Sequence, residues 1–107
     1  MKAADRLLWW LFAGSMGGKN RARIVDLLIK GPCNLNQIAE RLGMGYKTAQ
    51  HHVRVLVENH MLESQGPHYG KFYFPSPFLE ENLKVFEEIW KRIGKKGIRD
   101  ESNGGMH

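Results

Sequence analysis

Residues 46–54 concentrate side chains that can form hydrogen bonds and carry positive charge. If this stretch is helical, its spacing leaves Ala49 and Val53 facing inward and places the polar groups on the outer face. Those outward groups can bind a polar, negatively charged surface. They are Tyr46, Lys47, Gln50, His51 and Arg54.

Groupings typical of catalysis are weak by comparison. Glu80-Glu81 and Glu87-Glu88 are paired carboxylates, but they accompany lysines on an expected amphipathic helix, where such pairs form a solvated face. The sequence has no G-x-S-x-G, no phosphate-binding loop and no His-Glu-x-x-His. We therefore expect that the protein is not an enzyme and uses no cofactor.

The single cysteine limits both disulfides and metal sites. Cys33 cannot form an intramolecular disulfide or a cysteine-rich zinc site, and it favours a reduced, cytoplasmic compartment. Such a cysteine is typically a small buried apolar residue. His51 and His52 are adjacent, so they point to different faces of a helix. We predict no metal site.

Positive charge is concentrated near the start of the chain. The 107 residues hold 16 Lys+Arg and 11 Asp+Glu, a net charge of +5, and residues 1–30 hold six basic and two acidic side chains. Lys19, Arg21 and Arg23 lie at the expected start of a helix, where the helix dipole disfavours cations. A bound phosphate would explain them. No apolar run approaches the roughly 20 residues of a membrane-spanning helix.

The local signals predict short helices followed by a hairpin and a longer helix. Asn34 and Gln37 form an expected capping box, Gly43 ends that helix, and Ser76-Pro77 begins the last one. Helices are expected over about 3–13, from 20 to 30, from 34 to 42, from 45 to 59 and over 76–97, with strands over 62–65 and 71–74.

This order is that of a winged helix-turn-helix, a mainly helical fold with a small β-hairpin. The second helix of such a motif presents a polar face that fits the major groove of DNA. We predict four segments: an apolar helix and glycine-rich break, 1–18; a DNA-binding domain, 19–75; a dimerisation helix, 76–97; and a flexible tail, 98–107.

Over about residues 20–75 the sequence resembles the winged helix-turn-helix regulators of the ArsR type, in an archaeal-looking version. The resemblance is carried by Asn20-Arg21-Ala22-Arg23-Ile24-Val25-Asp26-Leu27-Leu28, by Leu35-Asn36-Gln37-Ile38-Ala39-Glu40-Arg41-Leu42-Gly43 and by Tyr46-Lys47-Thr48-Ala49-Gln50-His51-His52-Val53-Arg54-Val55-Leu56.

The resemblance implies a homodimeric transcription factor that binds double-stranded DNA, with the helix over about 45–59 in the major groove. Transferred by position, it also places His52 near the core as a structural histidine with satisfied hydrogen bonds. The base-contacting face would be Tyr46, Lys47, Thr48, Gln50, His51 and Arg54. Backbone phosphates would be left to Lys19, Arg21, Arg23 and Lys71.

The sequence departs from the family pattern in places that bear on function. His60 stands where the family often has a glycine with left-handed backbone, a conformation that histidine tolerates. Lys71 is the only full positive charge in the wing. The cysteine-rich metal-sensing motif is absent, and the expected helix 76–97 has no histidine for the family's other usual metal site.

Both ends carry more large apolar residues than a small winged domain needs to cover itself. The C-terminal apolar positions follow an a/d heptad spacing, so we predict a dimer interface built from both ends; internal packing in a monomer is the alternative. The predicted interface residues are Leu7, Leu8, Leu11, Leu79, Leu83, Phe86, Trp90 and Ile93.

Two further functions stay open: a winged helix that binds another protein through its apolar ends, and a regulator at a membrane surface. A membrane is the less favoured partner. The sequence does not identify the operator, the direction of regulation or a small-molecule effector.

Overall fold

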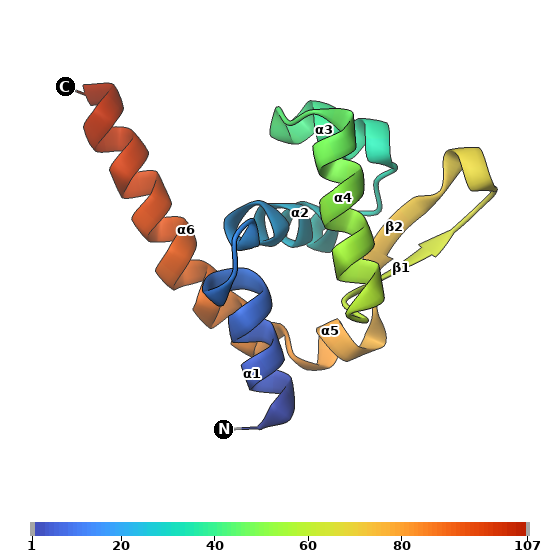
Figure 1. The fold of residues 1–107 in the computed structure, drawn as a ribbon, viewed down its shortest axis with the longest axis horizontal. Helices are drawn as coiled ribbons and strands as arrows, with labels where there is room; N and C mark the ends of the chain where they lie inside the picture. Colours follow the sequence, from blue (N-terminus) through green and yellow to red (C-terminus); the bar gives the residue numbers. More distant parts are fainter. Residues whose placement is uncertain (1, 107) are drawn as a thin grey trace. The chain divides into compact units, whose positions relative to one another are not determined.

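Helices form most of the chain, whose fold is given by a computed structural model (Figure 1). The structure describes the backbone of residues 2–106 and the side chains of residues 2–94. Two compact units can be distinguished. Asn20–Glu81 forms one, and the two ends of the chain, up to Lys19 and from Asn82 onward, form the other.

The end unit pairs helices from opposite ends of the chain. α1 (Ala3–Trp9) continues into a π-helical turn, η1 (Trp10–Gly14), and both pack against α6 (Leu83–Met106). Phe12 and Phe86 meet edge to face with ring centroids 5.1 Å apart, a favourable geometry for aromatic pairs. The helix predicted over 3–13 is therefore confirmed, with its last turn π-helical.

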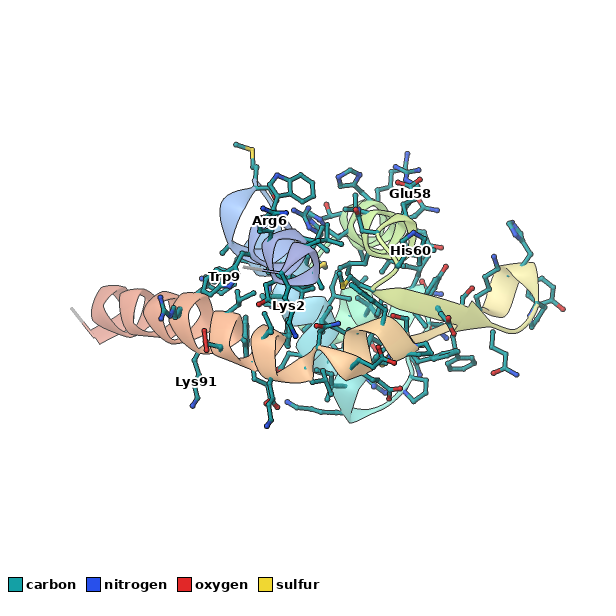
Figure 2. All side chains as sticks on the ribbon, turned by 90° about the horizontal axis from the view of Figure 1, so that it is seen from below. Lys2, Arg6, Trp9, Glu58, His60 and Lys91 are labelled. Atoms are coloured by element: carbon teal, nitrogen blue, oxygen red, sulfur yellow. The ribbon has the colours of Figure 1, made fainter. Side chains whose placement is uncertain are left out.

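A cation over an indole and a tight glycine turn complete this unit. The Arg92 guanidinium lies 5.5 Å from the centre of the Trp9 ring, while Lys91 points away from α1 (Figure 2). At Gly18, an added Cβ would lie 2.5 Å from the carbonyl oxygen of Phe12. No side chain fits there. The glycine at position 18 therefore allows its backbone to pass close to the backbone of Phe12.

The other unit begins with the helix-turn-helix. The capping box at its second helix is present: the Asn34 side chain accepts a hydrogen bond from Gln37 N–H at 2.8 Å, and the Gln37 side chain accepts one from Asn34 N–H at 2.9 Å. Gly43 ends that helix with φ 64°, the left-handed conformation that glycine adopts without strain. The three helices are α2 (Gly18–Lys30), α3 (Leu35–Leu42) and α4 (Tyr46–Glu58).

A two-stranded antiparallel hairpin, the wing, follows α4. β1 (Leu62–Gln65) pairs with β2 (Phe72–Pro75), and a short 3-10 turn, η2 (His68–Gly70), lies between them. The second strand begins one residue later than predicted. Tyr73 also pairs with Cys33 through two backbone hydrogen bonds of 2.8 and 3.3 Å, so the wing is tied to the segment that precedes α3.

Ser76 joins the wing to the next helix, α5 (Pro77–Glu81). Its hydroxyl accepts a hydrogen bond from Leu79 N–H at 3.1 Å and donates one to the His60 carbonyl at 2.6 Å. His60 has φ 64°, which confirms the left-handed turn expected there. Ser76 is therefore the predicted helix cap, and it also bonds the turn that follows α4.

The predicted C-terminal helix is divided. α5 ends at Glu81 and α6 begins at Leu83, separated by Asn82, a residue type that favours helix starts because its side chain competes for backbone hydrogen bonds. α6 extends to Met106, beyond the predicted end at residue 97. The tail predicted for residues 98–107 lies outside the residues whose side chains are described.

Half of the predicted dimer interface is buried within a single chain. Leu8, Leu11, Leu79 and Phe86 are each at most 1% exposed, so they are core residues and cannot present a surface to a second copy. The heptad spacing identified an apolar face but could not tell which element covers it. Leu7, Leu83, Trp90 and Ile93 keep partial exposure.

No helix in the described part of the chain is long and apolar enough to cross a membrane.

Candidate nucleic-acid interface

α4 presents a continuous polar face opposite a buried one. Ala49, Val53 and Leu56 are at most 2% exposed, and they recur at the spacing of one helix face. All six residues expected to contact bases lie on exposed positions of the same helix: Tyr46, Lys47, Thr48, Gln50, His51 and Arg54. The sequence periodicity was sufficient to separate the two faces.

Arg23 holds the helix-turn-helix rather than standing free. Its guanidinium donates to the Leu42 carbonyl at 2.7 Å and to Asn20 Oδ1 at 3.1 Å. Leu42 is the last residue of α3, so Arg23 satisfies a carbonyl that the helix leaves without a partner. Arg23 was predicted as a phosphate contact, which stays a prediction; these two bonds also give it a structural role in positioning the turn before α4.

Arg21 is buried, and this corrects its predicted phosphate contact. It is 4% exposed, and burial lowers the pKa of its guanidinium. Arg21 lies four residues before Val25 and seven before Leu28, on the buried face of α2. That periodicity was visible in the sequence and could have identified it. Of the three cations near the start of α2, Lys19 is the one at an exposed position.

His52 packs on the buried side of α4, as predicted, but one of its ring nitrogens lacks a hydrogen bond. It is 7% exposed, and its Nδ1 has no partner among the described residues. Burial, followed by the nearby positive charges of Arg21 and His51, lowers the pKa of the His52 imidazole. The expectation of a fully satisfied histidine was wrong, because burial does not guarantee a hydrogen-bond partner.

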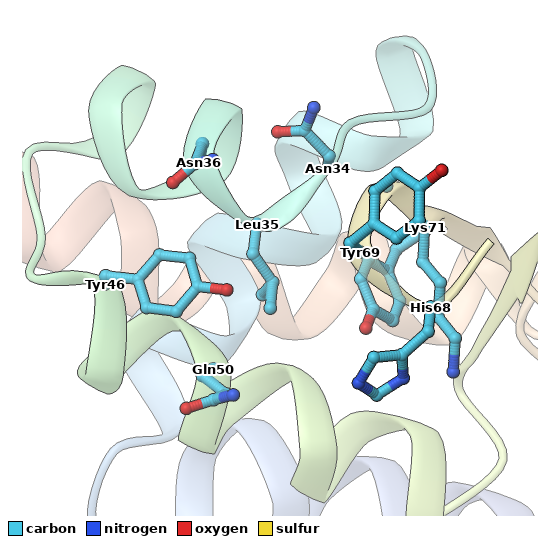
Figure 3. A pocket seen from close by; sticks show the side chains of 10 residues that line it. Asn34, Leu35, Asn36, Tyr46, Gln50, His68, Tyr69 and Lys71 are labelled. Carbon is cyan, nitrogen blue, oxygen red and sulfur yellow. The ribbon is translucent and has the colours of Figure 1, made fainter. Parts of the chain in front are cut away.

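Residues of the wing, of α4 and of the start of α3 line a pocket of ≈ 360 Å³ (Figure 3). Tyr46 and Gln50 contribute from α4, and Lys71 contributes from the wing. The sequence had placed these three on the interface, but not together. The remaining lining residues are Asn34, Leu35, Asn36, His68, Tyr69, Gly70 and Tyr73.

Tyr73 lines the pocket from the second strand of the wing. Burial, followed by the neighbouring Tyr46, raises the pKa of its phenol. It therefore stays protonated at neutral pH and can donate a hydrogen bond. Tyr69, near the tip of the wing, is 92% exposed. The sequence pattern indicated that Tyr73 faces away from Phe72 and Phe74, but not what it faces.

Within residues 2–94, the cysteine and the histidines do not combine into a metal site. Cys33 is 1% exposed, and its Sγ accepts a hydrogen bond from the Arg41 guanidinium at 3.2 Å. Among the side chains that the structure describes, no three His, Cys, Asp or Glu residues lie close enough to hold a metal ion. Cys33 is thus the buried residue that the sequence predicted.

Comparison with known proteins identifies the central segment. Residues 18–64 match the sequence model of a family described as bacterial regulatory protein, arsR family. No curated protein matches the sequence.

The fold is shared with solved structures of regulators. One similar structure is the winged helix-turn-helix DNA-binding domain of Mb0332 from Mycobacterium bovis, which is described as homodimeric and as a possible ArsR-family transcriptional regulator. It has 21% sequence identity to this chain and a TM-score of 0.64, and the match covers 88% of this chain and 85% of that one. The transcriptional repressor BigR from Xylella fastidiosa has 15% identity and a TM-score of 0.63, covering 85% and 84%.

A third similar structure is HlyU from Vibrio cholerae, with 17% identity and a TM-score of 0.63, covering 87% of this chain and 97% of that one. At these identities the likeness establishes a winged helix-turn-helix fold, and function must be argued from the site itself. All three proteins come from bacteria, so the archaeal character inferred from the sequence stays a prediction.

Proposed function

We propose, from the ArsR-family helix-turn-helix domain in residues 18–64, that the protein is a sequence-specific transcriptional regulator. It binds double-stranded DNA as a homodimer and acts in the cytoplasm, where prokaryotic chromosomal DNA lies. The observation that carries this proposal is the exposed polar face of α4, which is supported from behind by a buried apolar face.

The chemistry of this face suits the major groove. B-DNA admits an α-helix there and presents a distinct pattern of donors and acceptors for each base pair. Gln50 can form two hydrogen bonds with adenine, and Lys47 or Arg54 can bind guanine or a phosphate. Tyr46, Thr48 and His51 add hydrogen-bonding groups without fixed charge, so discrimination between sequences rests mainly on neutral side chains.

Phosphate binding depends on fewer cations than the sequence indicated. Since Arg21 is buried and Arg23 is bonded within the motif, Lys19 and Lys71 are the predicted phosphate contacts that we expect to contribute most. Each phosphate neutralised by a protein cation releases counterions and makes binding more sensitive to salt. We therefore expect a moderate salt dependence per protomer.

A homodimer would bring two α4 helices to the same duplex. The half-sites of helix-turn-helix dimers are about 34 Å apart, one turn of DNA. The apolar side chains of the end unit that keep some exposure are available for such an interface, and Trp10 is 52% exposed. The remaining candidates from the sequence are Leu7, Leu83, Trp90 and Ile93.

Selection of bound sequences from random duplex DNA, followed by fluorescence anisotropy with the selected site, tests the proposal. The wild-type protein should prefer that site strongly over random DNA. Gln50→Ala should reduce this preference by about 1–3 kcal/mol, because it removes a base contact. Lys30→Gln, at an exposed position whose ion pair with Asp26 lies within α2, should leave the preference unchanged.

An unchanged preference in Gln50→Ala would remove this residue from base recognition. If the wild-type protein selects no sequence and shows no salt-dependent binding to random DNA, the proposed function is wrong. The role of a protein-interaction module would then be favoured.

A further inference from the structure

The pocket between the motif and the wing combines three separate parts of the chain. Asn34–Asn36 form one wall, Tyr46 and Gln50 on α4 form another, and the wing contributes His68 to Lys71 together with Tyr73 (Figure 3). The backbone pairing of Tyr73 with Cys33 holds the wing beside the start of α3. The pocket is therefore formed by the tertiary fold of the unit Asn20–Glu81, and its walls are held together by backbone hydrogen bonds.

The lining of this pocket is polar and biased toward positive charge. Lys71 and His68 are present, and none of the ten lining residues is an aspartate or glutamate. The ion pair found among the described side chains joins Lys30 to Asp26, so it does not involve Lys71. Leu35 is the only aliphatic side chain in the lining.

Side chains with hydrogen-bond donors line the same pocket as Lys71. Tyr46 and Tyr73 both line the pocket, and each carries a hydroxyl that can donate a hydrogen bond. Gln50 and Asn36 supply amide groups. Neutral donors in the same pocket as a lysine, with no carboxylate in the lining, favour an oxygen-rich anion over a cation or an apolar ligand.

We propose that this pocket is a binding site for a phosphate group. When the protein is on DNA, the group is a backbone phosphate held between α4 and the wing; this part rests on the proposed function. In the absence of DNA, the same pocket takes free inorganic phosphate or the phosphate of a small metabolite. Its volume, ≈ 360 Å³, falls within the range of small-ligand sites, about 300–1,000 Å³.

The site gives the wing a role despite its single full positive charge. A phosphate in the pocket would contact residues from α4 and from the wing at once, and would fix the position of the wing relative to α4. Because Tyr46 and Gln50 also belong to the predicted base-contacting face, a free phosphate compound in the pocket would compete with DNA.

The first test uses the free protein. Its ¹⁵N-labelled amide signals are followed by NMR during titration with sodium phosphate, and sodium chloride of equal ionic strength is the reference. Saturable shifts are expected at residues 34–36, 46, 50 and 68–73. Lys71→Gln should weaken phosphate binding tenfold or more, because it removes the positive charge, and Tyr73→Phe should weaken it severalfold, because it removes a hydroxyl donor.

Lys30→Gln removes the same charge from an exposed position outside the pocket and should bind phosphate as the wild type does. Tyr73→Phe keeps the ring and the backbone pairing, so its effect does not depend on loss of the fold. Shifts that never saturate, or that Lys71→Gln and Tyr73→Phe leave unchanged, would overturn the phosphate site.

The second test uses DNA and distinguishes the two sources. The slope of log K against log salt concentration should fall by about 0.9 in Lys71→Gln, the value for one phosphate contact, and should be unchanged in Lys30→Gln. If the wild type binds DNA and Lys71→Gln retains the full slope, the DNA part of the proposal is wrong and the proposed function survives. If the wild type fails to bind DNA but binds inorganic phosphate saturably, the proposed function fails and the site is one for free phosphate compounds.

Discussion

At the scale of single residues, the neutral side chains proposed to contact bases are different residues from most of the basic side chains near the start of the chain. The exposed face of α4 carries Gln50, His51 and Tyr46, whose hydrogen bonds depend on geometry. Much of the basic excess before residue 31 is used elsewhere: Arg21 is buried and Arg23 bonds the end of α3. A cation in the sequence therefore says little about DNA contact until its surroundings are known.

Lys19→Ala should lower affinity for all DNA sequences alike. Lys19 is exposed and a phosphate contact does not depend on base identity, so the slope of log K against log salt should fall by about 0.9 while the specificity ratio is kept. Anisotropy titrations of specific and random DNA at several salt concentrations measure both quantities. A selective loss for the specific site would contradict a phosphate contact.

His52 should make the folded protein sensitive to acid. Its folded-state pKa is lowered from 6.5 by burial and by the nearby Arg21 and His51, so below about pH 6.5 the unfolded state binds more protons and the free energy of unfolding falls. The full loss is about 1.4 kcal/mol for each unit by which the pKa is lowered.

Urea unfolding at several pH values between roughly 5 and 8 checks this prediction. His52→Gln, which does not titrate, should flatten the dependence of the unfolding free energy on pH. His60→Asn, at an exposed position where asparagine accepts the left-handed backbone, should keep the wild-type dependence. An equal slope in His52→Gln and the wild type would assign the acid sensitivity to other groups.

At the scale of elements, the short turns before and after α4 set the direction of this helix. Gly43 has left-handed backbone between α3 and α4, Arg23 bonds the last carbonyl of α3, and Ser76 bonds the carbonyl of His60 after α4. Both ends of α4 are thus fixed by specific local geometry, while its middle is fixed by packing. A change in either turn would reorient the whole polar face.

Gly43→Ala should reduce stability by about 1–2 kcal/mol, the cost of left-handed backbone for a residue with a Cβ. No atom lies within 4 Å of the position that the Cβ would take, so the loss arises from backbone strain and not from a clash. Gly31→Ala is the matched control, because its Cβ would also meet no atom and its φ is not positive. Chemical denaturation should show a loss in the first variant alone; equal losses would refute the strain argument.

At the scale of the whole molecule, several large apolar side chains at the two ends of the chain are buried in a core, and others keep some exposure. Phe12 and Phe86 join α1 and α6 within one chain, so the monomer buries much of what the heptad spacing had assigned to a partner. Trp10, at 52% exposure, and the partly exposed Ile93 remain on the outside of this unit. A second copy is the proposed occupant of that surface.

Ile93→Glu should shift the protein from dimer toward monomer, because it places a charge in an apolar contact. Sedimentation equilibrium should show at least tenfold weaker self-association, and circular dichroism should show the helices retained. Lys91→Gln, which changes the charge by the same amount at an exposed position on α6, should dimerise normally. A wild type that stays monomeric at high concentration would refute the homodimer.

Local signals were enough for most elements and for the polar face of α4. The capping box at Asn34, the glycine at 43 and the cap at Ser76 appear where the sequence predicted them, and the hairpin does so to within one residue, because each depends on residues a few positions apart. The pocket was not predictable, since it joins the start of α3 to the wing through the pairing of Cys33 with Tyr73.

The sequence by itself determined where most of the helices lie, which faces are apolar and which polar groups α4 presents, because those properties follow from chain periodicity and side-chain chemistry. Only the tertiary structure decided that Arg23 bonds the end of α3, that His52 has an unpartnered nitrogen and that Phe86 packs against Phe12. Burial is set by contacts between residues far apart in the chain, and a local pattern can mark an apolar face without showing what will cover it.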